Sequence, residues 1–96
     1  MSDITLGIIG GGQLGSMLAI AAKKLNVKTV IFSDDADAPA QNFCNQFISA
    51  NYNDKQKVAD FIRQVDIVTY EFENIPFETL NEINKLKPVL PKPSVN

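Results

Sequence analysis

Residues 8–15 read Ile-Ile-Gly-Gly-Gly-Gln-Leu-Gly, and this stretch decides which fold the chain can adopt. All five glycines of the 96-residue chain lie between residues 7 and 15. Residues 10–15 match the pattern G-x-G-x-x-G, after an apolar run that suits a buried strand and before a helical pattern. Glycines at these positions let the chain turn tightly and let a ligand reach backbone N–H groups at the positive end of a helix. The stretch therefore predicts a strand, a phosphate-facing loop and a helix.

A second interpretation gives these glycines a structural role only, in the turn and in close packing of the helix on the sheet. Gly7 lies inside the predicted strand, and we expect it to be a packing glycine. Gly12 ends the loop and Gln13 adds a polar side chain where the helix starts, so both are candidate ligand contacts.

The remaining sequence alternates between strand and helix patterns. Strands are predicted at residues 4–9, 28–32 and 65–70, with an edge strand at 47–50 and a possible final strand at 89–90. Helices are predicted over 13–25, from a cap at Asn53 or Asp54 onward, and from Pro76 to about Leu86. The expected apolar face of the first helix is Leu14, Met17, Leu18, Ala21 and Leu25, and that of the second is Val58, Phe61, Ile62 and Val65. We therefore predict an α/β, Rossmann-like fold, with helices on both faces of a mostly parallel sheet of strand order 3-2-1-4.

Composition excludes several functions. The chain contains no His and one Cys, Cys44, which excludes histidine acid–base catalysis, histidine-bound metal and an intrachain disulfide. The formal charge of −2 without a basic cluster argues against binding to nucleic acid or to an acidic membrane. No signal segment or membrane-spanning run is present, so we expect one soluble, cytoplasmic domain. Cys44 is expected to be a small buried apolar residue.

A second candidate site follows the strand that ends at Tyr70, where the sequence reads Glu71-Phe72-Glu73. Side chains two residues apart share a face in extended chain, so Glu71 and Glu73 would project together. Taken alone, this segment is more typical of a solvated loop with two ordinary acids. With the predicted strand order, however, both carboxylates flank the same cleft as the glycine loop. Because carboxylates repel phosphate, they would hold a hydroxyl pair or an amine of the same ligand, as in a phosphoribosyl compound.

Asp34 supports a different ligand. It lies just beyond the second predicted strand, where a dinucleotide-binding fold places the acid that holds the adenosine ribose. Asp34 could equally be a turn residue beside Asp35 and Asp37, and this acidic trio could also suggest a cation site, although its spacing defines none. A dinucleotide-binding module of an NAD(P)-dependent dehydrogenase or a nucleotide sensor therefore stays open as the alternative function.

Three segments together resemble the N-terminal domain of the 5-(carboxyamino)imidazole ribonucleotide synthase family of ATP-grasp enzymes. They are residues 8–15, the Asp-Ala-Pro-Ala of residues 37–40, and the Val-Thr-Tyr-Glu-Phe-Glu-Asn-Ile-Pro of residues 68–76. The resemblance covers essentially the whole chain.

This resemblance implies a Rossmann-like pre-ATP-grasp fold and a ligase of purine biosynthesis. The family joins bicarbonate to 5-aminoimidazole ribonucleotide through a carboxyphosphate intermediate, with ATP and magnesium, and tends to form homodimers. Its N-terminal domain contributes to the ribonucleotide site, so the resemblance places substrate contacts at Gln13, Leu14 and Glu71, and also at Glu73 and Asn74.

The chain departs from the family in two local features and in length. Ser16 stands where the family commonly has Arg, so a charged contact from that position is in doubt, and Ser33-Asp34-Asp35-Ala36 replaces an Asp-Pro turn. We expect residues 1–91 to form the pre-ATP-grasp domain and 92–96 to begin a linker to an absent ATP-grasp domain. That absent domain would bind ATP and Mg, so no catalytic residue, metal or cofactor is expected in this chain. A fragment that only dimerises is a further alternative.

Overall fold

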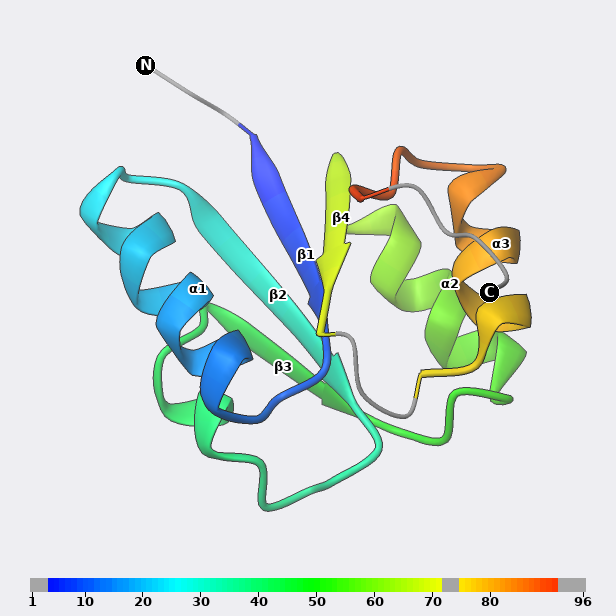
Figure 1. The fold of residues 1–96 in the computed structure, drawn as a ribbon, viewed down its shortest axis with the longest axis horizontal. Coiled ribbons are helices and arrows are strands. Elements are labelled where there is room, and N and C mark those ends of the chain that lie inside the picture. Colours follow the sequence, from blue (N-terminus) through cyan, green and yellow to red (C-terminus); the bar gives the residue numbers. More distant parts are fainter. Residues whose placement is uncertain (1–3, 72–74, 92–96) are drawn as a thin grey trace.

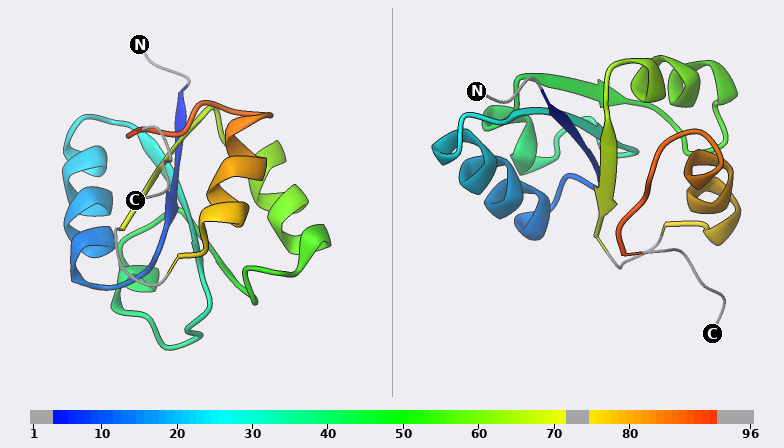
Figure 2. Two further views of the ribbon diagram at one scale, coloured as in Figure 1. Left: turned by 45° about the vertical axis from the view of Figure 1, so that its right-hand side comes forward. Right: turned by 90° about the horizontal axis from the view of Figure 1, so that it is seen from above.

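The computed structural model describes residues 4–71 and 75–91, and its centre is a parallel sheet of four strands. The strands are β1 (Thr5–Ile9), β2 (Lys28–Ser33), β3 (Gln46–Ser49) and β4 (Ile67–Tyr70), in the order β3-β2-β1-β4. Helix α1 (Gln13–Lys24) and the 3-10 helix η1 (Pro39–Asn42) cover one face, and α2 (Lys55–Arg63) and α3 (Phe77–Asn84) cover the other (Figures 1 and 2). The predicted fold class and strand order are confirmed.

The predicted final strand is reduced to one bridge. Val89 pairs in parallel with Val68 of β4, through hydrogen bonds from the Val68 N–H to the Pro88 carbonyl and from the Leu90 N–H to the Val68 carbonyl, both 2.8 Å. Pro88 and Pro91 flank this pair and have no N–H to donate, so the ladder cannot extend.

Each face of the sheet has its own apolar core. Alternation along β1 directs Ile9 to the α2 and α3 side, where it packs with Phe32 and Phe61, and directs Ile8 to the α1 side with Ala19. All these side chains are at most 2% exposed. The central strands are therefore buried on both faces, which is why they read as continuous apolar runs in the sequence.

The predicted buried face of α1 is wrong except at Leu18, which is partly buried against the core on that side of the sheet. Met17, expected in the core, is 59% exposed, and Leu14 and Leu25 are also exposed. The face that packs on the sheet and on η1 instead carries small residues: Gly15, Ser16, Ala19 and Ala22. This helix lies so close to the loop before it that a Cβ on Gly15 would be 2.6 Å from the Gly10 carbonyl oxygen. Close approach selects small side chains, which a count of large apolar residues does not detect.

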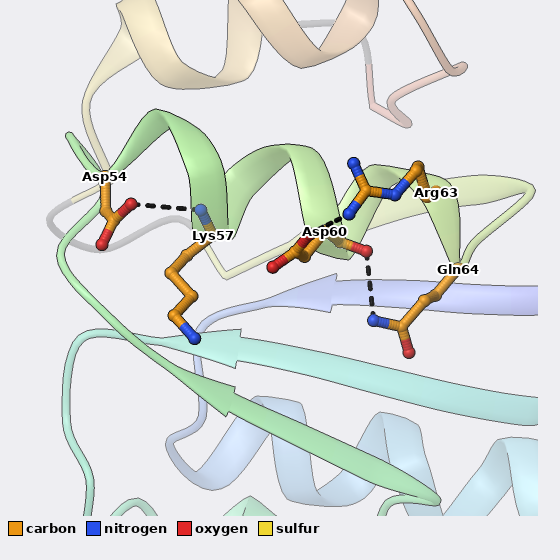
Figure 3. A network of polar contacts seen from close by, with 5 residues as sticks. All are labelled: Asp54, Lys57, Asp60, Arg63 and Gln64. Carbon is orange, nitrogen blue, oxygen red and sulfur yellow. Dashed lines mark hydrogen bonds and ion pairs between the residues drawn. The ribbon is translucent and has the colours of Figure 1, made fainter.

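Local polar contacts define the bounds of α2 (Figure 3). The Asp54 Oδ1 accepts a hydrogen bond of 3.1 Å from the Lys57 N–H, so Asp54 rather than Asn53 is the N-cap. At the other end, Arg63 pairs with Asp60, and Gln64 Nε2 donates to the Asp60 carbonyl. These exposed contacts leave Phe61 and Ile62 facing the core.

Gly7 is a packing glycine, as predicted. A Cβ at this position would lie 2.6 Å from Phe61 Cζ and 2.9 Å from Val65 Cγ1. Both neighbours are at most 1% exposed, so neither has open space into which it can move.

We therefore expect Gly7→Ala to lower the free energy of unfolding by about 1–3 kcal/mol, the usual cost of an overfilled core. Urea denaturation of the variant measures this loss. Ser49→Ala, on the exposed side of β3, is the control and should change stability by less than about 0.5 kcal/mol. An unchanged urea midpoint for Gly7→Ala would show that Phe61 and Val65 leave room for a methyl group at this position.

Candidate functional site

The candidate site lies where the carboxyl ends of the parallel strands meet. The glycine loop follows β1, Ser33 ends β2, and Glu71 follows β4 directly. The Gly10 N–H donates to the Phe32 carbonyl of β2 (2.8 Å), and the Glu71 N–H donates to the Ile9 carbonyl of β1 (2.9 Å). These bonds bring the two predicted motifs, 56 residues apart in the chain, to the same edge of the sheet.

Glu71 contacts the N-terminus of α1. Its Oε1 accepts a hydrogen bond of 2.7 Å from the backbone N–H of Gly15, in the first turn of the helix. Gly12, the N-cap, has no side chain to satisfy such a group. The carboxylate is favourable here because the first-turn N–H groups carry the positive end of the helix dipole. Glu71 therefore caps a helix whose first turn lies 56 residues earlier in the chain, at Gly15.

The glycines leave the space that Glu71 and Ala38 occupy. Gly10 has φ of +108°, and a Cβ there would lie 2.8 Å from Glu71 Oε2. A Cβ on Gly11 would lie 2.5 Å from the Ala38 Cβ. The structural interpretation of these two glycines therefore has a direct geometric basis. Phosphate binding by the loop stays a prediction.

Gln13 and Leu14 are the first two residues of α1, beside Glu71. Both side chains are exposed, Leu14 by 41%. In the described part of the chain no hydrogen-bond acceptor faces their backbone N–H groups, whereas that of Gly15 is bound to Glu71. The two N–H groups are therefore available to an anionic ligand.

The remaining predicted contacts have different outcomes. Glu73 and Asn74 lie outside the described residues. Ser16, the position where the resembled family commonly has Arg, is 9% exposed and donates its hydroxyl to the Gly12 carbonyl at 3.0 Å. That position lies on the buried face of α1, and its hydrogen bond to Gly12 stabilises the end of the glycine loop.

A cavity of about 200 Å³ lies next to the glycine loop. Its walls are residues 10–12, Ser33, Asp34, Asp35, Ala38, Pro39, Tyr52 and Glu71. Sequence reasoning missed Tyr52, which lies between β3 and α2. The available signal was its position shortly after the predicted edge strand, because parallel strands place such residues at the ligand edge.

The acidic turn after β2 has two roles. Asp34 lines the cavity, while Asp35 shapes the turn: its N–H donates to Ser33 Oγ (3.1 Å) and its Oδ1 accepts from the Asp37 N–H (2.9 Å). Within residues 4–71 and 75–91, no three Asp, Glu or Cys side chains converge as metal ligands.

Cys44 is half-buried, not fully buried, and packs beside Ile31 and Ala40. Burial raises the pKa of its thiol, which keeps it protonated. No helix in the described ranges is long and apolar enough to span a membrane.

Fold and site together define a class: a Rossmann-like domain with a polar cavity at the carboxyl edge of its sheet. A family model described as the ribonucleotide synthetase preATP-grasp domain matches residues 3–95. The chain belongs to this family. The family match therefore does not support the alternative function, a dinucleotide-binding module of a dehydrogenase.

Curated relatives agree with this assignment. The chain is 46% identical over 82 residues to the N5-carboxyaminoimidazole ribonucleotide synthase of Staphylococcus epidermidis, a match that covers 85% of this chain and 22% of that protein. The enzyme of the same name from Brucella melitensis is 42% identical over 90 residues, covering 94% of this chain and 25% of that protein. The chain thus spans about a quarter or less of the length of these relatives.

Solved structures share the fold. The N5-carboxyaminoimidazole synthetase of Staphylococcus aureus, crystallised with ADP, superimposes with a TM-score of 0.84 at 37% identity, over 91% of this chain and 24% of that chain. The Thermus thermophilus N5-carboxyaminoimidazole ribonucleotide synthetase superimposes with a TM-score of 0.85 at 32% identity, over 90% of this chain and 24% of that chain.

The cap on α1 can be tested by two substitutions of one residue. We expect Glu71→Ala to lower the free energy of unfolding by about 1 kcal/mol, because the Gly15 N–H loses its acceptor. Glu71→Gln should cost less, since its amide oxygen can still accept that hydrogen bond. Urea denaturation measures both. Equal stability of Glu71→Ala and the unmodified chain would contradict the capping role.

The titration of Tyr52 is a second test. Burial, together with the negative charges of Asp34 and Glu71, raises the pKa of its phenol to about 12, from an ordinary value of about 10. The folded chain thus holds this proton more tightly than the unfolded chain. The resulting stabilisation is complete below pH of about 10 and is lost as the pH rises through about 12.

We expect the absorbance titration at the tyrosinate band to contain a component with a midpoint of about 12 that Tyr52→Phe removes. The free energy of unfolding of the unmodified chain should fall across the same interval relative to that of Tyr52→Phe. If the component that Tyr52→Phe removes had the ordinary tyrosine midpoint, the Tyr52 hydroxyl would face solvent.

Proposed function

We propose that this chain is the ribonucleotide-binding N-terminal domain of an ATP-dependent ligase that carboxylates 5-aminoimidazole ribonucleotide with bicarbonate in purine biosynthesis. The main support is the position of Glu71 against the first turn of α1, next to the available N–H groups of Gln13 and Leu14. The family match and the relatives' names supply the reaction.

The geometry suits a ligand with two chemically different ends. Gly12, Gln13 and Leu14 offer backbone groups at a helix N-terminus, which favour a phosphate. Glu71 can only accept hydrogen bonds when ionised, so it suits the hydroxyl groups of a ribose. Its bond to the Gly15 N–H offsets part of the negative charge that would otherwise repel a phosphate, and it leaves the N–H groups of Gln13 and Leu14 unoccupied. A phosphoribosyl compound satisfies both ends.

The rest of the reaction belongs, in this proposal, to the parts that the longer relatives carry in addition to the matched region. We assign ATP, Mg²⁺ and the chemistry with bicarbonate to those parts, so the 96-residue chain alone is not catalytic. Residues 1–91 would form the substrate domain and residues 92–96 the start of the linker, with Glu73 and Asn74 as further substrate contacts. A cytoplasmic homodimer is the proposed form of the whole enzyme.

Titration of the ¹⁵N-labelled chain with 5-aminoimidazole ribonucleotide tests the proposal. We expect the amide signals of Gln13, Leu14 and Glu71 to shift in a saturable way, because phosphate would bind the first turn of α1 and ribose would bind Glu71. The affinity should be weak, since part of the site is absent.

Glu71→Ala is the loss-of-function variant for this titration, and we expect binding about tenfold weaker or worse. Cys44→Ser, away from the carboxyl ends of the strands, is the matched control and should bind like the unmodified chain. Absence of shifts at millimolar ligand, or tighter binding of NAD(H) than of the ribonucleotide, would contradict the proposed function.

A further inference from the structure

Tyr52 is the one aromatic side chain in the wall of the cavity beside the glycine loop, as far as the described residues go. It shares the wall of that cavity with Glu71 and Asp34, which directly follow β4 and β2, the two strands on either side of β1. Its phenol therefore faces the same space as the predicted ribose contact, although neither the sequence motifs nor the family resemblance assigns it a role.

Two contacts hold Tyr52 in place, one made by its ring and one made by its backbone carbonyl. It stacks on Phe32 of β2, with ring centroids 5.8 Å apart and an interplanar angle of 29°. Phe32 is itself 2% exposed and is held edge-on by Phe61 of α2 at 5.7 Å. The Tyr52 carbonyl accepts a hydrogen bond of 3.4 Å from Thr79 Oγ1 of α3. A side chain held in this way presents its polar end without a large entropic cost when a ligand binds.

The hydroxyl differs chemically from the groups around it. Asp34 and Glu71 are the charged groups that face it, and both are acceptors only when ionised. Burial of the phenol, together with these two charges, raises its pKa to about 12, so it keeps its proton at neutral pH. Tyr52 is thus a neutral group that can donate a hydrogen bond in a wall that also carries the carboxylates of Asp34, Asp35 and Glu71.

A sugar hydroxyl needs both kinds of partner. It donates its own hydrogen to an acceptor and accepts another hydrogen at its oxygen. Glu71 can take the first role and the Tyr52 hydroxyl the second. A carboxylate pair alone would leave the sugar oxygen facing two negative charges, which favours an amine over a hydroxyl.

We propose that Tyr52 is a specificity-determining residue of the ribonucleotide site, whose hydroxyl donates a hydrogen bond to a ribose oxygen of the ligand that Glu71 holds. The inference deepens the function proposed above and rests on it. It predicts that Tyr52 contributes to recognition of the sugar and not to recognition of the phosphate.

The test compares Tyr52→Phe with the unmodified 96-residue chain in NMR titrations against three probes. These are 5-aminoimidazole ribonucleotide, ribose 5-phosphate and inorganic phosphate. Phenylalanine keeps the stacking on Phe32 and removes only the oxygen. We expect Tyr52→Phe to bind both ribose-containing probes about tenfold more weakly, as for loss of one good hydrogen bond, and to bind inorganic phosphate unchanged. Cys44→Ser, which changes no residue of the cavity wall, is the control and should leave all three affinities unchanged.

The outcomes separate the two proposals. If the unmodified chain does not bind the ribonucleotide, the proposed function fails and this inference fails with it. If that chain binds and Tyr52→Phe binds equally well, only the inference is overturned. Weaker binding of inorganic phosphate to Tyr52→Phe would also overturn it, because the effect would then come from a disturbed loop.

A second measurement needs no substitution, so its outcome does not depend on whether Tyr52→Phe folds. In the chain labelled with 3-fluorotyrosine, the ¹⁹F signal of Tyr52 should shift with ribose 5-phosphate and stay in place with inorganic phosphate. A signal that is insensitive to ribose 5-phosphate at saturation would overturn the inference.

Discussion

The hydrogen bond between the Glu71 carboxylate and the Gly15 N–H joins the two halves of the ligand edge. It places a negative charge on the positive end of α1, and the N-cap Gly12 cannot supply that charge because it has no side chain. The bond is possible only because β1 and β4 are neighbours in register, with Ile9 beside Tyr70, so that each strand delivers its next residues to the same place. The glycine loop needs its conformational freedom at Gly10, where any larger residue would overlap this carboxylate.

The same close approach explains the unusual packing of α1. Helix α1 begins immediately after the glycine loop and lies close to the sheet and to η1. Its inner face can therefore hold only small residues such as Ala19 and Ala22. Its larger apolar side chains are on the outside, with Met17 as the clearest case. On the opposite face, α2 and α3 cover large residues, and Phe61 fills the space that Gly7 leaves open on β1. The two faces therefore use opposite distributions of side-chain size.

Electrostatics at the ligand edge are balanced by backbone groups and by one neutral phenol. Glu71 is held by a backbone N–H, and Asp35 is engaged with the backbone of its own turn. Asp34 and Glu71 both act on Tyr52, whose proton is retained because burial and these charges disfavour the phenolate. The edge therefore combines carboxylate acceptors, the neutral Tyr52 hydroxyl and the N–H groups of the first turn of α1. These are the groups on which the proposed recognition of a sugar phosphate rests.

The sequence by itself determined the order of elements, the parallel sheet and the two motifs at its edge, because strand and helix periodicity and the glycine spacing are local properties. It also indicated Glu71, since the strand that precedes it has a clear pattern. The tertiary structure alone decided which face of α1 is buried, because that depends on how closely the helix approaches the loop. It decided that Glu71 caps α1, and it brought Tyr52 into the wall beside Asp34 and Glu71. These features join residues far apart in the chain, so the distances that create them exist only once the sheet has formed.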